Sequence, residues 1–145
     1  MGVTNFDEYR DVFVVADTID DVVHPVTYEL IGQARRIAKE LGQLVQVMLL
    51  GENVQSEAEE LVAHGADIVH VFESPLLKYY TTDGYTKVLT DFFEDHKPNI
   101  LLIGATNNGR DLAPRMSGRM KNGVVADCTI LTVDTEEGLV EWTIF

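Results

Sequence analysis

Short apolar runs alternate with longer amphipathic stretches along the chain. The runs are rich in β-branched and aromatic side chains and end at glycine or at polar residues, as buried strands do. The four clearest runs are 11–16, 44–50, 68–72 and 100–103. Between them, apolar residues recur at helical spacing. This alternation predicts an α/β fold with a mostly parallel sheet that is covered by helices on both faces.

Local signals place the ends of two of the predicted helices. Pro25 stands where a helix can begin and Gly42 where it can end, on either side of apolar residues at helical spacing. Ser56 and Glu59 have the spacing of a capping box, so we expect a second helix that begins there and stops at Gly65.

Residues 73–85 form a longer connection in this interpretation. The segment contains Tyr79, Tyr80 and Tyr85, and its length and aromatic content suit a loop that covers another part of the molecule. Its tyrosines have two open interpretations. They either anchor a partner protein, because amphipathic rings are favoured at interfaces, or pack against their own sheet.

The last part of the chain has the alternating pattern of a hairpin. The runs 124–131 and 139–145 flank a polar, glycine-containing loop at 134–138, which predicts an antiparallel pair at one edge of the sheet. The sequence ends on apolar residues at Phe145, whereas natural chain ends are usually polar. We therefore expect the natural chain to continue past this point.

Composition limits the classes of partner. The chain has 145 residues, the size of one domain, and its formal net charge is -13. Such a surface repels phosphate backbones and anionic membranes, so we expect no nucleic acid partner. No apolar run is long enough for membrane insertion, and Cys128 is the single cysteine, which suits packing as a small hydrophobe in a cytoplasmic protein.

The strand at 100–103 leads into a turn that is the best candidate for a binding or interface loop. In open α/β sheets such turns lie at the carboxyl edge, where ligands and partners dock. The loop consists of Thr106, Asn107, Asn108, Gly109, Arg110 and Asp111. Because Pro114 is best tolerated near a helix start, we expect the N-cap at Asp111, whose carboxylate would disfavour a bound phosphate. Capping and subunit contact are therefore favoured over anion binding here.

Other candidate groups point to no reaction. His24, His64, His70 and His96 do not have the spacing of metal ligands, so no metal site is proposed. The carboxylates of Asp17, Asp20 and Asp21 follow a strand with no partner histidine, which favours a solvated loop. Ser74 and Ser117 lack the sequence context of a catalytic nucleophile. We expect no catalytic residues and hence no enzyme activity in this domain.

Several segments together resemble the N-terminal domain of the electron-transfer flavoprotein alpha subunit. The main match runs through residues 104–115 and 126–129, and supporting matches lie at 24–30, 63–67 and 71–73, in the family's order. The resemblance implies a three-layer sandwich like that of adenine nucleotide hydrolases and stress proteins. It also implies a heterodimer in which alpha and beta subunits hold FAD and carry electrons from dehydrogenases to an acceptor.

In that family FAD sits mainly in a second alpha-subunit domain, C-terminal to the part present here. The resemblance therefore implies that residues 1–145 are a scaffold and interaction domain, with no FAD bound to this chain alone and the flavin domain lying beyond Phe145. The alternative is a stand-alone nucleotide-binding module of the stress-protein-like fold, in which the Thr106 to Asp111 loop would hold a phosphate.

Overall fold

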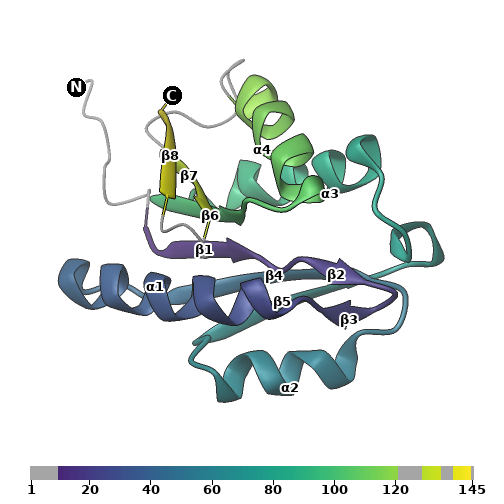
Figure 1. Ribbon diagram of the computed structural model, residues 1–145, viewed down its shortest axis with the longest axis horizontal. Coiled ribbons are helices and arrows are strands. Elements are labelled where there is room, and N and C mark those ends of the chain that lie inside the picture. Colours follow the sequence, from purple (N-terminus) through teal and green to yellow (C-terminus); the bar gives the residue numbers. More distant parts are fainter. Residues whose placement is uncertain (1–9, 121–128, 135–138, 145) are drawn as a thin grey trace.

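The computed structural model describes residues 10–120, 129–134 and 139–144 (Figure 1). Its main sheet has six strands in the order β5-β4-β1-β6-β7-β8. Their bounds are β1 Val12–Val15, β4 Val45–Gly51, β5 Ile68–Glu73, β6 Ile100–Gly104, β7 Thr129–Asp134 and β8 Leu139–Ile144. The helices are α1 Pro25–Leu41, α2 Gln55–Ala63, the short 3-10 helix η2 Pro75–Leu77, α3 Thr82–Asp95 and α4 Asn107–Arg119.

The sheet has the predicted topology. The strands from β5 through β7 pair in parallel, and β8 pairs antiparallel with β7, so the mostly parallel sheet and the antiparallel edge hairpin are confirmed. The boundary of β7 differs from the prediction, because the strand extends to Asp134 instead of ending at Leu131. The expectations for Cys128 and for the start of that strand at residue 124 lie outside the described residues.

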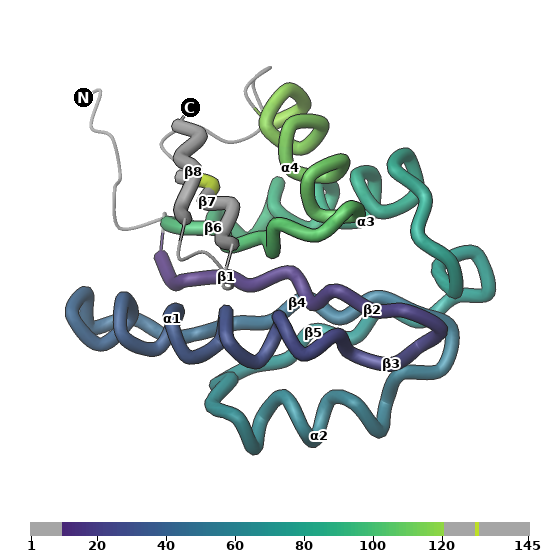
Figure 2. The backbone as a smooth tube through the Cα atoms, viewed as in Figure 1, coloured from purple at the N-terminus to yellow at the C-terminus, as the bar shows by residue number. Residues whose placement is uncertain are grey.

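Helices cover both faces of the sheet, α1 and α2 on one and α3 and α4 on the other (Figure 1). Alternation along β1 explains this: Val12 and Val14 pack under α1, whereas Phe13 and Val15 face α3 and α4. The backbone trace in Figure 2 follows α1 and α2 on one side before the chain crosses to α3 after β5. Two apolar cores result, separated by the sheet, and burial of both accounts for the unbroken apolar runs in the sequence.

Helix α1 begins and ends where the sequence predicted, and α2 does not. Pro25 is the first residue of α1, and Gly42 closes it with a φ of 66°. The capping box at Ser56 and Glu59 was wrong: the helix begins one residue earlier, and its N-cap residue Val54 makes no side-chain cap bond. The carboxylate of Glu73, at the end of β5, instead accepts a hydrogen bond from the Val54 amide at 2.9 Å.

The connection before α3 is shorter than the predicted loop. Helix α3 begins at Thr82, with the Thr81 hydroxyl accepting a hydrogen bond from the Gly84 amide at 3.2 Å, so Tyr85 lies inside the helix. Tyr85 is buried, and its hydroxyl donates to the Leu77 carbonyl at 3.1 Å. Tyr85 thus packs against its own domain, whereas Tyr79 remains 65% exposed.

The acidic segment after β1 is a small hairpin and not a solvated loop. Strands β2 Thr18–Ile19 and β3 Val22–Val23 pair antiparallel across a two-residue turn, in which Asp20 and Asp21 both have positive φ. The Asp21 carboxylate accepts hydrogen bonds from the amides of Glu52 and Asn53 at 2.9 and 3.1 Å. It therefore fixes the turn after β4.

Candidate functional site

The candidate site lies where the chain changes direction across the sheet. From β1 the chain passes through α1 to β4 on one side, whereas β6 lies on the other side of β1. The carboxyl ends of β1 and β6 are therefore neighbours with diverging connections, the position at which open α/β sheets bind ligands. Helix α4 begins at this point, so the predicted Thr106 to Asp111 loop is its N-cap and first turn.

Thr106, and not Asp111, is the N-cap of α4. Its hydroxyl accepts a hydrogen bond from the Gly109 amide at 3.1 Å and donates to the Asp17 carboxylate at 2.5 Å. The prediction failed because Pro114 lies in the helix interior, where its missing amide hydrogen is a cost of about 3 kcal/mol that tertiary contacts override. Leu112, on the same helix, packs into the second core.

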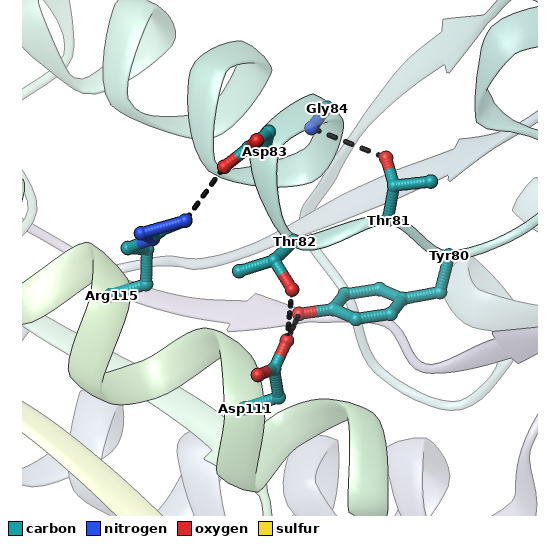
Figure 3. Close-up of polar contacts among 7 residues, drawn as sticks. All are labelled: Tyr80, Thr81, Thr82, Asp83, Gly84, Asp111 and Arg115. Atoms are coloured by element: carbon teal, nitrogen blue, oxygen red, sulfur yellow. Dashed lines mark hydrogen bonds and ion pairs between the residues drawn. The ribbon is translucent and has the colours of Figure 1, made fainter.

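Asp111 instead joins α4 to the start of α3. Its carboxylate accepts hydrogen bonds from the hydroxyls of Tyr80, at 2.7 Å, and of Thr82 (Figure 3). The hydrogen bonds from Thr82 and Tyr80 lower the pKa of the Asp111 carboxyl. Burial, followed by the bond to Asp111, raises the pKa of the Tyr80 hydroxyl. An ion pair between Arg115 and Asp83 at 2.7 Å ties the same two helices together.

We call the place where the carboxyl ends of β1 and β6 lie side by side, with their connections diverging, the switch point. The cavity at the switch point is very small. It has a volume of about 20 Å³ and is lined by Asp17, Tyr85, Gly104 and Gly109, among others. That volume holds about one water molecule, whereas sites for small organic ligands usually enclose about 300–1,000 Å³. Gly109 shows how closely the elements approach, because a Cβ at this position would lie 1.8 Å from the Gly104 carbonyl oxygen. The first turn of α4 rests directly on the end of β6.

The electrostatics of this cavity are unfavourable for an anion. A helix N-terminus attracts negative charge, but the Asp17 carboxylate already lies at the N-terminus of α4. Burial raises the pKa of the Tyr85 hydroxyl, and the carboxylates of Asp17 and Asp21 raise it further, which reports the negative potential around this ring. A phosphate placed here would have to displace or neutralise carboxylates of the chain itself.

The remaining residues of the predicted loop differ in exposure. Asn107 and Arg110 are exposed, Asn108 is half-buried, and Gly109 is buried against β6. The Arg110 guanidinium donates from Nε to the Ala105 carbonyl at 3.3 Å. Asn107 and Arg110 therefore face solvent at the carboxyl edge, where they are accessible to another protein.

Most of the other candidate residues have local structural roles. His24 caps α1 by accepting a hydrogen bond from the Val26 amide at 3.0 Å, and Ser74 caps η2. His70 is within 2.6 Å of Gln46 Oε1, and its ring centroid lies 6.0 Å from that of His96. Burial, and then the charge of His96, lower the pKa of His70. Across the described ranges, no three histidine, cysteine or acidic side chains are grouped so that they could hold a metal ion.

Sequence reasoning missed the polar contacts of Asp17 and Asp111 that organise the site. The Asp17 to Thr106 bond joins residues 89 positions apart, and the Asp111 bonds reach back to Tyr80 and Thr82. No local spacing signals such pairs.

Of the helices that the structure describes, none has the length and apolar character needed to cross a membrane.

Comparison with known proteins identifies similar chains. The model of the electron transfer flavoprotein domain matches residues 12–145. The chain is 45% identical over 136 residues to an electron transfer flavoprotein subunit alpha of Megasphaera elsdenii, covering 94% of this chain and 40% of the relative. It is 45% identical over 133 residues to lactate dehydrogenase (NAD(+),ferredoxin) subunit LctC of Acetobacterium woodii, covering 92% of this chain and 32% of the relative.

A solved structure supports the same architecture. A universal stress protein in complex with cAMP superposes with a TM-score of 0.52 at 15% identity, covering 88% of this chain and 98% of the other. At this identity the likeness concerns the fold alone, and it agrees with the predicted three-layer sandwich. The chain itself spans only 40% and 32% of the length of the two relatives above.

Proposed function

The chain belongs to the electron transfer flavoprotein domain family, and on this premise we propose that it is the N-terminal scaffold domain of an electron-transfer flavoprotein alpha subunit. In this role it positions a flavin-binding domain and a beta subunit and performs no redox step itself. The assembled protein carries electrons on FAD between dehydrogenases and an acceptor. The cytoplasmic location expected from the sequence stays a prediction.

The chain length supports this division of labour. Relatives that match over nearly the whole chain are more than twice as long, which leaves room in them for a further domain. The flavin domain is accordingly proposed to lie in sequence C-terminal to residue 145. A reading frame that continues past Phe145 into a glycine-rich domain supports this proposal, and a natural stop codon there contradicts it.

The observation that carries the scaffold role is that the switch point is closed, which means that α4 rests on the end of β6 and leaves only a very small cavity there. A cavity of about 20 Å³, far smaller than usual sites for small ligands, with the Asp17 carboxylate at the helix N-terminus, supports a role without a bound flavin or adenine nucleotide. The same edge presents Asn107 and Arg110 to solvent. We assign these two residues to subunit contact.

Nucleotide binding by this chain is the competing function, and equilibrium dialysis distinguishes the two. The purified chain is dialysed against radiolabelled AMP and ATP, separately, with and without magnesium. The scaffold role predicts no retention in the micromolar range for the chain or for Asp17→Ala, in which the blocking carboxylate is removed. Stoichiometric retention by the unmodified chain would contradict the scaffold role and favour the nucleotide-binding module.

A further inference from the structure

A depression with three cationic side chains lies at the amino edge of the sheet, at the far end of the strands from the switch point. Its volume is about 360 Å³, and Arg35, Arg36 and Lys39 of α1 line it together with Val45 and Gly65. Val45 is the first residue of β4, which fixes the depression at the end where the parallel strands begin. We call this depression the basic groove.

The charge in the basic groove contrasts with the rest of the chain. Three of the 11 Lys and Arg residues are gathered within one stretch of α1, in a chain that has 24 Asp and Glu residues. All three side chains are exposed. Within the described residues, none of the three makes an ion pair or a side-chain hydrogen bond. The groove therefore gathers three positive charges against the single carboxylate, Asp67, that also lines it.

The Arg35 side chain passes over a glycine. Gly65 has a φ of 120°, and a Cβ at this residue would lie 2.3 Å from Arg35 Cδ and 2.5 Å from Nη1. The arginine stem therefore crosses the space that any other residue would fill. A larger residue at position 65 would therefore displace the Arg35 side chain from its place in the groove.

The surroundings favour a chain of carboxylates over one compact anion. The groove lies toward the carboxyl end of α1, so it offers an anion only side-chain donors and none of the free backbone N–H groups with which a helix N-terminus holds a phosphate. Asp67, whose carboxylate accepts a hydrogen bond from the Val45 amide at 2.9 Å, also lines it. Leu41 and Leu44, each 45% exposed, do not line the groove but lie between the groove residues Lys39 and Val45 in sequence, and they expose apolar surface there.

We propose that the basic groove binds an acidic, amphipathic segment of a partner protein. Spaced carboxylates of the segment pair with Arg35, Arg36 and Lys39, and its apolar side chains pack on Leu41 and Leu44. Charge complementarity selects this partner, because an acidic segment is repelled by most of the remaining surface and attracted here. The groove is independent of the closed switch point and of the flavin-scaffold role.

Fluorescence anisotropy of a labelled peptide in which Glu alternates with Leu tests this proposal on the full chain. Two double variants carry the same net charge: Arg36→Gln with Lys39→Gln in the groove, and Lys87→Gln with Arg119→Gln on α3 and α4 as the control. We expect the groove variant to bind the peptide about tenfold more weakly or not at all, and the control to bind it nearly as the parent chain does. Added salt should weaken binding to the parent chain.

Four results would overturn the proposal. They are no binding of the peptide by the parent chain, equal binding of a peptide with Gln in place of Glu, equal losses in the two double variants, and displacement of the peptide by inorganic phosphate at a matched anion concentration. Circular dichroism of both double variants verifies that they are folded, which is expected because all four side chains are exposed.

Discussion

Replacing Gly109 with alanine tests directly how tightly α4 rests on the end of β6. The added Cβ would lie 1.8 Å from the Gly104 carbonyl oxygen and 3.1 Å from Ile103 Cγ2. The nearest atom belongs to the backbone, so the clash cannot be relieved by rotating a side chain. The first turn of α4 must shift away from the strand, and with it the Thr106 hydroxyl that bonds Asp17.

Gly118, in the same helix, provides the matched control. A Cβ at Gly118 would meet nothing within 4 Å. Alanine stabilises a helix interior relative to glycine by about 0.5–1 kcal/mol. Because Gly118 lies in the last turn of α4, Gly118→Ala should raise stability by up to that amount. Gly109→Ala carries, in addition, the overpacking penalty of about 1–3 kcal/mol, and we expect the upper end because the contact is with backbone.

Urea denaturation followed by circular dichroism measures both free energies of unfolding, with the slopes compared to verify that the transitions are equivalent. The expected order of stability is Gly118→Ala, then the parent chain, then Gly109→Ala. If Gly109→Ala were as stable as Gly118→Ala, α4 would not contact Gly104, and the closed switch point would have to be abandoned.

Three further predictions concern the sheet, the α3 to α4 contact and the proposed interface. Leu102 is a fully buried residue of β6, so Leu102→Ala should lower the free energy of unfolding by about 2–5 kcal/mol. The control Leu76→Ala, at a residue that is 84% exposed, should change it by no more than about 0.5 kcal/mol. A loss below roughly 1 kcal/mol for Leu102→Ala would exclude Leu102 from the core. Hydrogen bonds lower the pKa of Asp111 in the folded state, so its ionised carboxylate stabilises the fold at pH values above the ordinary aspartate pKa. This stability is lost as the pH falls through the folded-state pKa. Denaturation at a series of pH values should therefore show Asp111→Asn less stable than the parent near neutrality and equal to it in acid, and a constant difference would contradict this role. Arg110→Ala should leave the melting temperature nearly unchanged and weaken association of the longer alpha chain with its beta subunit, measured by sedimentation; unchanged association would remove Arg110 from the interface.

Local patterns predicted most of the architecture. The apolar runs identified the strands because a sheet covered on both faces needs apolar residues at consecutive positions, and Val12 through Val15 are all buried. Pro25 and Gly42 marked the ends of α1 because their preferences arise from their own backbone chemistry. The parallel order with an antiparallel edge then followed from the alternation of elements.

Polar contacts between distant segments were beyond the reach of local patterns. The sequence favoured Ser56 as a cap, but the fold brings Glu73 to the start of α2. It favoured Asp111 as the N-cap of α4, but Thr106 has that role with Asp17 behind it. In each case the carboxylate comes from a strand end or loop that is distant in sequence and is brought close only by the folded sheet. The closed switch point could therefore not be predicted from local sequence patterns.

The scaffold role is tested most directly by the absorbance spectrum of the purified protein with added FAD. After removal of free flavin, the 145-residue chain should be folded and colourless, whereas the longer alpha chain mixed with its beta subunit should be yellow. Flavin bands at stoichiometric occupancy in the 145-residue chain would contradict the account, because a cavity of about 20 Å³ with a carboxylate at the helix N-terminus could not then be the state of the switch point.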